Sequence, residues 1–182
     1  MPYHSIKTST MKFTITVLTL SVYAAMHLTS CGSAAKSMID YPKDCSRLEA
    51  DLDRGTLNGV PPTVGFNVAK TQFTCFTGET EEGSDFNCGG GVFFLDHQFF
   101  LYTHRDYIEM RKGFAGSVVQ GLTFGMKRSD VVKIIGFPDV QPDVDTELYQ
   151  KDYGTLRIEY RYGELDIIAL HAVSPDEVEL CR

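Results

Sequence analysis

The sequence predicts an α+β fold, in which short helices pack on one face of an antiparallel sheet. One segment, 130–135, repeats apolar residues with the period of a helix and is closed by a glycine. The stretch 147–172 alternates apolar and polar residues and is interrupted by glycines, which is typical of consecutive antiparallel strands. A helix followed by such strands is the order expected when helices cover one side of a sheet.

The predicted helix at 130–135 has both a start and a stop. Its apolar side chains share one face, at Val131, Ile134 and Ile135. Ser129 can cap the N-terminus, and Asp130 is favourable in the first turn because the helix dipole is positive there. Gly136 suits the left-handed conformation that ends many helices, and Pro138 follows it.

Three strands are predicted after this helix, over 147–151, 155–161 and 165–172. In the middle strand, Leu156, Ile158 and Tyr160 alternate with Arg157, Glu159 and Arg161. This alternation predicts one buried face and one exposed face. Gly154 and Gly163 mark the turns, so we expect an antiparallel meander.

The earlier part of the sequence is less regular. Its leucines and a following glycine predict a short helix over Cys45–Arg54. Residues 64–77, rich in Val, Phe and Thr, are expected to be extended. The apolar runs Val92–Leu95 and Phe99–Thr103 predict a hairpin that continues into Tyr107–Arg111.

A short apolar run before Cys31 indicates export. The run spans the 16 residues 13–28, fewer than the roughly 20 that a membrane-spanning helix needs, and it follows the positive charge of Lys12. With Leu28-Thr29-Ser30-Cys31 it resembles a bacterial lipoprotein signal and its lipobox. The resemblance implies that residues 1–30 are a signal peptide, with translation starting at Met1 or Met11. It also implies that Cys31 becomes the lipidated N-terminus.

The resemblance also implies a location. Gly32 is not the aspartate that marks retention in the inner membrane, so we expect an outer-membrane anchor with the protein facing the periplasm. Residues 31–44 would be the tether between lipid and domain. Two alternatives stay open: cleavage after Ser33-Ala34-Ala35 would release a soluble protein, and an uncleaved segment would remain attached.

The remaining chain is acidic and of single-domain size. Removing residues 1–30 leaves 152 residues, enough for one domain over 45–182. The removed part has two lysines and no acidic residue, so the remainder carries a formal charge of −9. This charge argues against nucleic-acid binding and is compatible with a basic protein partner.

Four cysteines remain after Cys31 is assigned to the lipid: Cys45, Cys75, Cys88 and Cys181. An even number in an exported chain predicts two disulfides, with three possible pairings. We favour Cys75–Cys88, which closes a hairpin-like loop, and Cys45–Cys181, which ties the C-terminus to the start of the domain. The cysteines form no Cys-x-x-Cys pair, so a zinc site is not expected.

The segment from Gly125-Met126 to Gly136-Phe137-Pro138, with the meander after it, resembles the BamE/SmpA family of outer-membrane lipoproteins and BLIP-like domains. In that family a helix with a Gly-Met start and a Gly-x-Pro end precedes strands that pack on it. Lys127 stands where the family has Thr or Ser. The resemblance implies an α+β fold that can contain two tandem helix-plus-sheet units. The two candidate halves are 45–113 and 114–182.

The sequence offers no catalytic motif. The chain after residue 30 has three histidines, His97, His104 and His171, and neither a Gly-x-Ser-x-Gly nor a His-Glu-x-x-His pattern. Gly89-Gly90-Gly91 precedes a predicted strand and not a helix, which disfavours a phosphate-binding loop. We therefore expect a non-enzymatic protein with no cofactor and no metal.

Six aromatic residues lie within 15 positions: Phe93, Phe94, Phe99, Phe100, Tyr102 and Tyr107. Strand alternation sends about half of them to each side of the sheet. Core packing explains part of the cluster, and a partner-binding face is the alternative. The candidates for that face are Phe94, Phe100, Tyr102 and Tyr107.

These observations favour a membrane-anchored lipoprotein that binds other proteins of the cell envelope, in an assembly or scaffold role. An immunity or inhibitor lipoprotein that neutralises a periplasmic toxin or hydrolase is an alternative, suited by small size, acidity and disulfides. A third hypothesis is an enzyme that acts on the envelope. Fold analogy alone does not decide among them.

Overall fold

A computed structural model describes residues 41–80 and 89–180 of the chain. The predicted signal peptide, Cys31, most of the tether, Cys88 and Cys181 lie outside the described residues. The predictions that concern only these residues are therefore not addressed by the structure.

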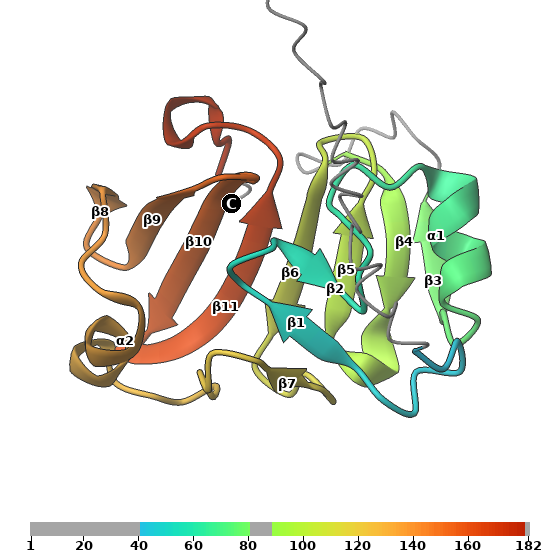
Figure 1. Cartoon of the computed structure of the whole chain (residues 1–182), viewed down its shortest axis with the longest axis horizontal. Coiled ribbons are helices and arrows are strands. Elements are labelled where there is room, and N and C mark those ends of the chain that lie inside the picture. Colours follow the sequence, from blue (N-terminus) through green and yellow to red (C-terminus); the bar gives the residue numbers. More distant parts are fainter. Residues whose placement is uncertain (1–40, 81–88, 181–182) are drawn as a thin grey trace, which may run out of the picture. The chain divides into compact units, whose positions relative to one another are not determined.

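The described residues form one large antiparallel sheet of eight strands (Figure 1). In spatial order the strands are β3 (Gly78–Thr80), β4 (Gly91–Phe94), β5 (Phe99–Tyr102), β6 (Tyr107–Arg111), β11 (Glu164–His171), β10 (Gly154–Arg161), β9 (Thr146–Lys151) and β8 (Val140–Asp143). At the centre, β6 and β11 pair through five residue pairs, from Tyr107–His171 to Arg111–Ile167.

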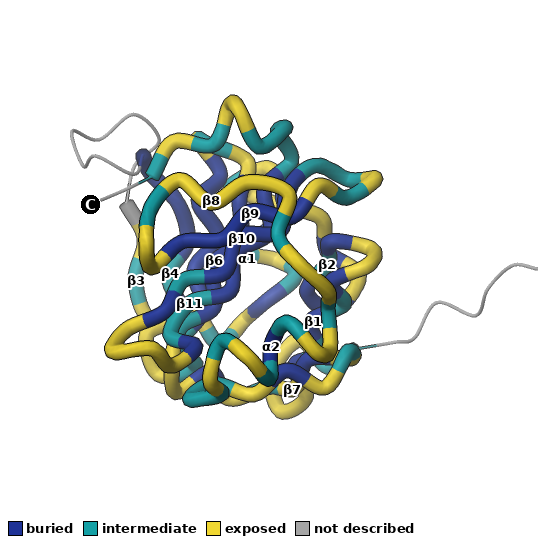
Figure 2. Tube along the Cα trace, turned by 90° about the vertical axis from the view of Figure 1, so that its left-hand side faces the viewer, coloured by how far each residue is buried: buried dark blue, intermediate teal, exposed yellow. Residues whose placement is uncertain are grey.

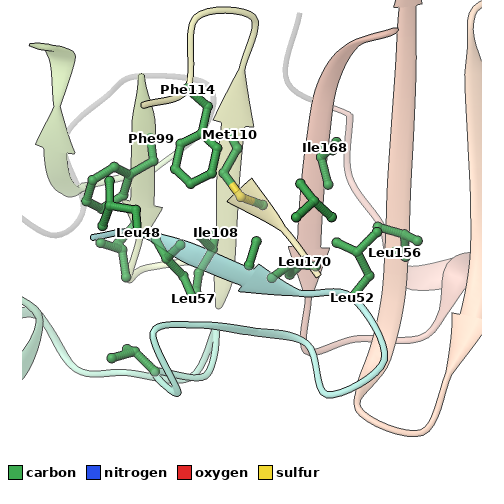
Figure 3. Close-up of a cluster of buried hydrophobic side chains, with 14 of the residues drawn as sticks. Leu48, Leu52, Leu57, Phe99, Ile108, Met110, Phe114, Leu156, Ile168 and Leu170 are labelled. Atoms are coloured by element: carbon green, nitrogen blue, oxygen red, sulfur yellow. The ribbon is translucent and has the colours of Figure 1, made fainter. Parts of the chain in front are cut away.

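A smaller sheet lies against the middle of the large one (Figure 1). Its strands are β2 (Thr56–Leu57), β1 (Glu49–Asp51) and β7 (Ser117–Val118), with β1 parallel to β7. Leucines from this layer, Leu48, Leu52 and Leu57, face apolar side chains of the large sheet such as Ile108 and Leu170 (Figure 3). The core is therefore built mainly by one sheet packing on another.

Two helices adjoin the same core. Helix α1 (Phe66–Gln72) contributes Ala69, and helix α2 (Arg128–Ile135) contributes Val131, both fully buried. Two 3₁₀ turns complete the described elements, η1 (Leu95–His97) and η2 (Pro175–Glu177).

The predicted α+β class is wrong. The described residues are mostly β, and the two α-helices have only seven and eight residues. We expected helices to cover one face of the large sheet. The layer over its centre is instead formed by β1, β2 and β7, which the sequence patterns did not predict as strands.

The errors fall in the earlier part of the chain. The segment 45–54 is not a helix but contains β1. Ala50 in β1 and its flanking residues Leu48 and Leu52 are buried with the two-residue period of a strand. The segment 64–77, expected to be extended, contains α1.

The later elements are confirmed. Helix α2, the meander β9–β10–β11 and the hairpin β4–β5 with its continuation β6 lie where the patterns predicted them. Gly136 ends α2 with a positive φ of +88°, but its ψ of −171° is not that of the left-handed helical conformation that we expected. The predicted cap is wrong, because Lys127 occupies the N-cap position and Ser129 lies inside the helix.

The element order repeats along the chain. Helix α1 precedes the four strands β3–β6, and helix α2 precedes the four strands β8–β11. The last strands of the two groups, β6 and β11, pair with each other, and we call this pair the seam. We call the group β3–β6 with α1 the first half and β8–β11 with α2 the second half.

Candidate functional site

The disulfide candidates are paired differently from our expectation. Cys45 is bonded to Cys75, with Cα atoms 6.0 Å apart, so the favoured pairs Cys75–Cys88 and Cys45–Cys181 are wrong. The backbone N–H of Thr74 donates to the carbonyl of Lys43 at 2.8 Å. This bond holds the segment before β1 beside the end of α1, where the two cysteines meet.

The aromatic candidates lie on opposite faces of the large sheet. Phe94 is fully buried in the core and stacks on Phe99 at 4.1 Å between ring centroids, so it offers no surface to a partner. The other three, Phe100, Tyr102 and Tyr107, share the face that points away from β1, β2 and β7, which we call the far face. They too are buried, because they pack against one another and against neighbouring side chains.

The far face holds a buried ion pair across the seam. Ala169 on β11 pairs with Glu109 on one side and Arg157 on the other. Its small side chain leaves room for Arg157 Nη2 to donate to Glu109 Oε2 at 2.7 Å. The side chain of Arg157 is 1% exposed. The prediction that the polar face of 155–161 is exposed is therefore wrong at Arg157.

Glu109 also makes an ion pair with Arg111. Arg111 Nε donates to the other oxygen of Glu109 at 2.6 Å, and its guanidinium lies 4.3 Å from the ring centroid of Phe100. Glu109 thus accepts hydrogen bonds from two guanidinium groups. Charge-assisted bonds of this kind offset the large cost of burying a carboxylate.

His171 is the buried histidine of the far face. Its ring stacks on Tyr107 across the seam, 4.7 Å between centroids, and only 3% of the residue is exposed. Burial, and to a lesser degree the charge of Arg157, lowers the pKa of His171 to about 3, so the imidazole is neutral at physiological pH. Burial also raises the pKa of the Tyr107 hydroxyl, which stays protonated.

A cavity of about 320 Å³ opens beside His171. Its lining comes from the β5–β6 turn, the end of β11 and the C-terminal segment: His104, Arg105, Tyr107, His171, Val173, Glu177 and Glu179. On its rim, Arg105 Nη1 and Glu179 Oε2 form an ion pair of 2.5 Å. The cavity therefore combines a neutral imidazole with charges of both signs.

Exposed apolar side chains surround α2 and β8. The side that faces the viewer in Figure 2 shows β8 as exposed, whereas β9 and β10 are buried. Five large apolar residues of this region are exposed: Ile134, Phe137, Val140, Val144 and Tyr162. We call these five residues the α2–β8 surface. The three most exposed are Phe137 at 86%, Val144 at 74% and Tyr162 at 97%.

Backbone and side-chain contacts hold this surface together. Arg128 on α2 donates to the carbonyl of Val144, and the next residue, Asp145, accepts from the backbone of Tyr160 at 2.8 Å. Lys127 forms an isolated bridge with Glu164, which places the turn carrying Tyr162 beside the start of α2. The sequence does not reveal these residues, because exposure of single apolar side chains leaves no periodic pattern.

Acidic residues lie between the apolar ones. Asp139, Asp143 and Asp145 alternate with the apolar residues of the segment 137–145. Asp139 accepts the backbone N–H of Gln150 at 2.7 Å, and Asp143 accepts that of Asp145 at 2.8 Å. The nearby Lys133 is paired with Asp130 at 2.7 Å. The segment thus presents carboxylates beside apolar groups.

These features define a mostly β domain with a small polar cavity and an exposed aromatic surface. Comparison with protein-family models, curated proteins and solved structures gave no match to this chain. The resemblance to the BamE/SmpA family therefore stays a prediction. Within residues 41–80 and 89–180, no helix has the length and hydrophobicity needed to cross a membrane. The same residues contain no group of three or more His, Cys, Asp or Glu placed to hold a metal ion.

Proposed function

We propose that this chain is a non-catalytic lipoprotein, anchored through Cys31 to the bacterial outer membrane on its periplasmic side, that binds other proteins of the cell envelope. The observation that carries the proposal is the α2–β8 surface. Phe137, Val144 and Tyr162 are each at least 74% exposed, and contacts of Lys127 and Arg128 bring the turns that carry Val144 and Tyr162 to the start of α2. Exposed apolar groups that gather in this way mark interaction sites on soluble domains.

The chemistry of the surface favours protein as the ligand. Aromatic side chains supply most of the binding energy at interfaces, and burying one contributes about 1.5–3 kcal/mol. The aspartates of 137–145 would form the rim of such an interface, where charges increase the association rate and select the partner. A partner with apolar groups flanked by Lys or Arg fits this surface, in agreement with the acidic charge of the chain.

A photo-crosslinking experiment in intact envelopes tests the surface. A photoreactive residue at Val140 would capture the partner of the full-length protein, and the double variant Phe137→Ser, Tyr162→Ser would then be compared. We expect the crosslink to fall strongly, because losing two anchors costs about 3 kcal/mol, or roughly a hundredfold in Kd. Val68→Ser, which changes an exposed apolar side chain on α1, is the matched control.

The captured protein distinguishes the candidate functions. Components of an envelope assembly support the proposed role, whereas a single basic toxin or hydrolase would favour the inhibitor alternative. Crosslinks that persist unchanged in the double variant, or that are lost equally in Val68→Ser, would contradict the assignment of this surface.

The lipid anchor has its own test. Cys31→Ser removes the thiol that would carry the acyl chains, and we expect the protein to move from the membrane fraction to the soluble fraction of the periplasm. Fractionation followed by immunoblotting measures the change. A protein that stays in the membrane fraction without Cys31 is not anchored by lipid at this position.

A further inference from the structure

The cavity beside His171 has the composition of a binding site for a small charged molecule. We propose that it binds a small zwitterion, a free amino acid or a short peptide, with the ligand carboxylate toward Arg105 and the ligand ammonium group toward Glu177 and Glu179. This inference is independent of the proposed function, because the α2–β8 surface contributes no residue to the cavity.

One residue that lines the cavity, His171, has a buried polar atom without a hydrogen-bond partner in the described part of the chain. Nε2 of His171 is buried, the residue is 3% exposed, and no hydrogen bond to this atom occurs among the described residues. Leaving a buried polar atom unpaired costs about 1–3 kcal/mol. Because His171 lines the cavity, a ligand that reaches this nitrogen would recover that free energy.

The rim carries opposite charges that a ligand can use. The Arg105–Glu179 pair is open to solvent, with side chains 32% and 73% exposed, so it contributes little to stability. A ligand carboxylate can therefore share Arg105 at small cost. Glu177 Oε2 accepts hydrogen bonds from the backbone N–H and the hydroxyl of Ser174, which fixes the carboxylate beside the cavity.

The balance of charges favours a zwitterion over a simple ion. One guanidinium and two carboxylates line the same small space. An anion alone would be repelled by the glutamates, and a cation alone would leave Arg105 without a new partner. A molecule with both charges can pair with Arg105 and with the glutamates at the same time. The cavity volume of about 320 Å³ is at the lower end of the size range of small-molecule sites.

The site is formed by rigid backbone. The N–H of Ala172 donates to the carbonyl of Asp106 at 3.0 Å, which joins the two segments that carry the lining residues. On the adjacent strand, a Cβ at Gly154 would lie 2.3 Å from the carbonyl oxygen of His171, and Gly154 has φ +138°. Only glycine allows this approach, which fixes the end of β11 in place.

Calorimetric titration of the full-length protein tests the proposal with four defined probes. Alanine and alanylalanine are the zwitterions, propionate is the matched anion and ethylamine is the matched cation. We expect both zwitterions to saturate one site, at least about tenfold more tightly than either single ion, because each charge-assisted bond is worth about 1.5–3 kcal/mol.

Three variants localise the binding. Glu179→Gln, on the exposed rim, and His171→Phe, on the floor, should each weaken zwitterion binding about tenfold. Lys133→Gln, which changes an exposed ion pair on α2, should leave it unchanged. Near-ultraviolet circular dichroism shows whether each variant is folded, and Glu179→Gln keeps the test informative if His171→Phe does not fold.

Three results would overturn the proposal. The first is that neither zwitterion saturates the wild-type protein. The second is that propionate or ethylamine binds as tightly as the zwitterions. The third is that Glu179→Gln leaves all four affinities unchanged.

Discussion

The two halves of the large sheet have the same order of elements but are stabilised by different interactions. In the first half, the core next to α1 is aromatic: Phe73 packs edge-on against Phe94 and Phe99, at 5.6 and 5.3 Å between centroids. In the second half, the strands contribute Leu156 and Ile158 to the core. The same topology therefore accepts two kinds of packing.

The two halves also differ in the length of their strands. The strands of the first half have three to five residues, whereas β9, β10 and β11 have six to eight. Short strands share few backbone hydrogen bonds. The Cys45–Cys75 disulfide joins the end of α1 to the segment before β1, on the side of the shorter strands. We infer that the covalent link supplies stability that longer strands provide in the second half.

Helix α2 is held by a polar contact instead of a disulfide. Glu147 on β9 is buried and accepts the hydroxyls of Tyr149 and Tyr160 at 2.8 and 2.7 Å. Arg128 Nε, at the start of α2, lies 3.0 Å from the other oxygen of Glu147. The helix beside the α2–β8 surface is therefore attached to the sheet by noncovalent contacts.

Breaking the ion pair across the seam should have the largest effect. Glu109→Ala removes the carboxylate that lies 2.7 Å from Arg157 Nη2 and leaves this buried guanidinium with the longer contact to Glu159, 3.3 Å from Nε. We expect a loss of about 3–5 kcal/mol in the free energy of unfolding. Both halves should unfold together, because the pair joins β6 to β10. Chemical denaturation measures the loss.

The matched control for this prediction is the double variant Glu109→Leu, Arg157→Met. Replacing both buried charges by apolar side chains should restore most of the lost stability, since no buried guanidinium is left behind. Arg111 also loses Glu109 in this variant, but its side chain is 44% exposed and can be solvated. A double variant as unstable as the single one would show that packing, and not the uncompensated charge, caused the loss.

Removing the disulfide should have a smaller effect that is confined to the first half and to the adjoining strand β1. The variant Cys45→Ala, Cys75→Ala loses a link between residues 30 positions apart, which predicts a loss of about 3 kcal/mol. Hydrogen exchange should rise in α1 and β1 and stay slow in β9–β11. Equal loosening of both halves would contradict the division of roles proposed above.

Acid should lower the free energy of unfolding, by less for each pH unit than the loss of the disulfide does. His171 has a pKa of about 3 in the folded protein against an ordinary value of 6.5. Between these values the unfolded chain binds a proton that the folded protein does not, so stability falls as the pH drops below 6.5, by up to about 1.4 kcal/mol per unit. Denaturation midpoints at pH 7, 6 and 5 measure the slope, and His171→Gln should reduce it. An unchanged slope in that variant would assign the acid sensitivity to other groups.

The sequence predicts the second half better than the first. The meander and α2 follow strict periods, so local patterns were sufficient there. Residues 48–52 were misjudged because Leu48 and Leu52 are spaced as on a helix, while Ala50 between them also completes a strand pattern. Pairing of Ala50 with Val118, far along the chain, decides between the two.

The polar groups of the far face show the same limit. Arg157 and His171 occupy polar positions of predicted strands, where exposure is the ordinary expectation. Their burial depends on Glu109 and Tyr107, which belong to the other half of the sheet. A single sequence carries no record of such distant partners.

The seam also determines when the sheet can be completed. During synthesis the chain grows from its N-terminus, so β6 is made well before β11, and residues 112–163 lie between them. Until β11 arrives, β6 is an open strand edge, and such edges tend to pair with other chains. Glu109 and Arg111 place charges on that edge, which discourages wrong pairing. Glu109, which pairs with the buried Arg157 in the finished sheet, thus also makes the open edge of β6 less prone to pair with other chains while the sheet is incomplete.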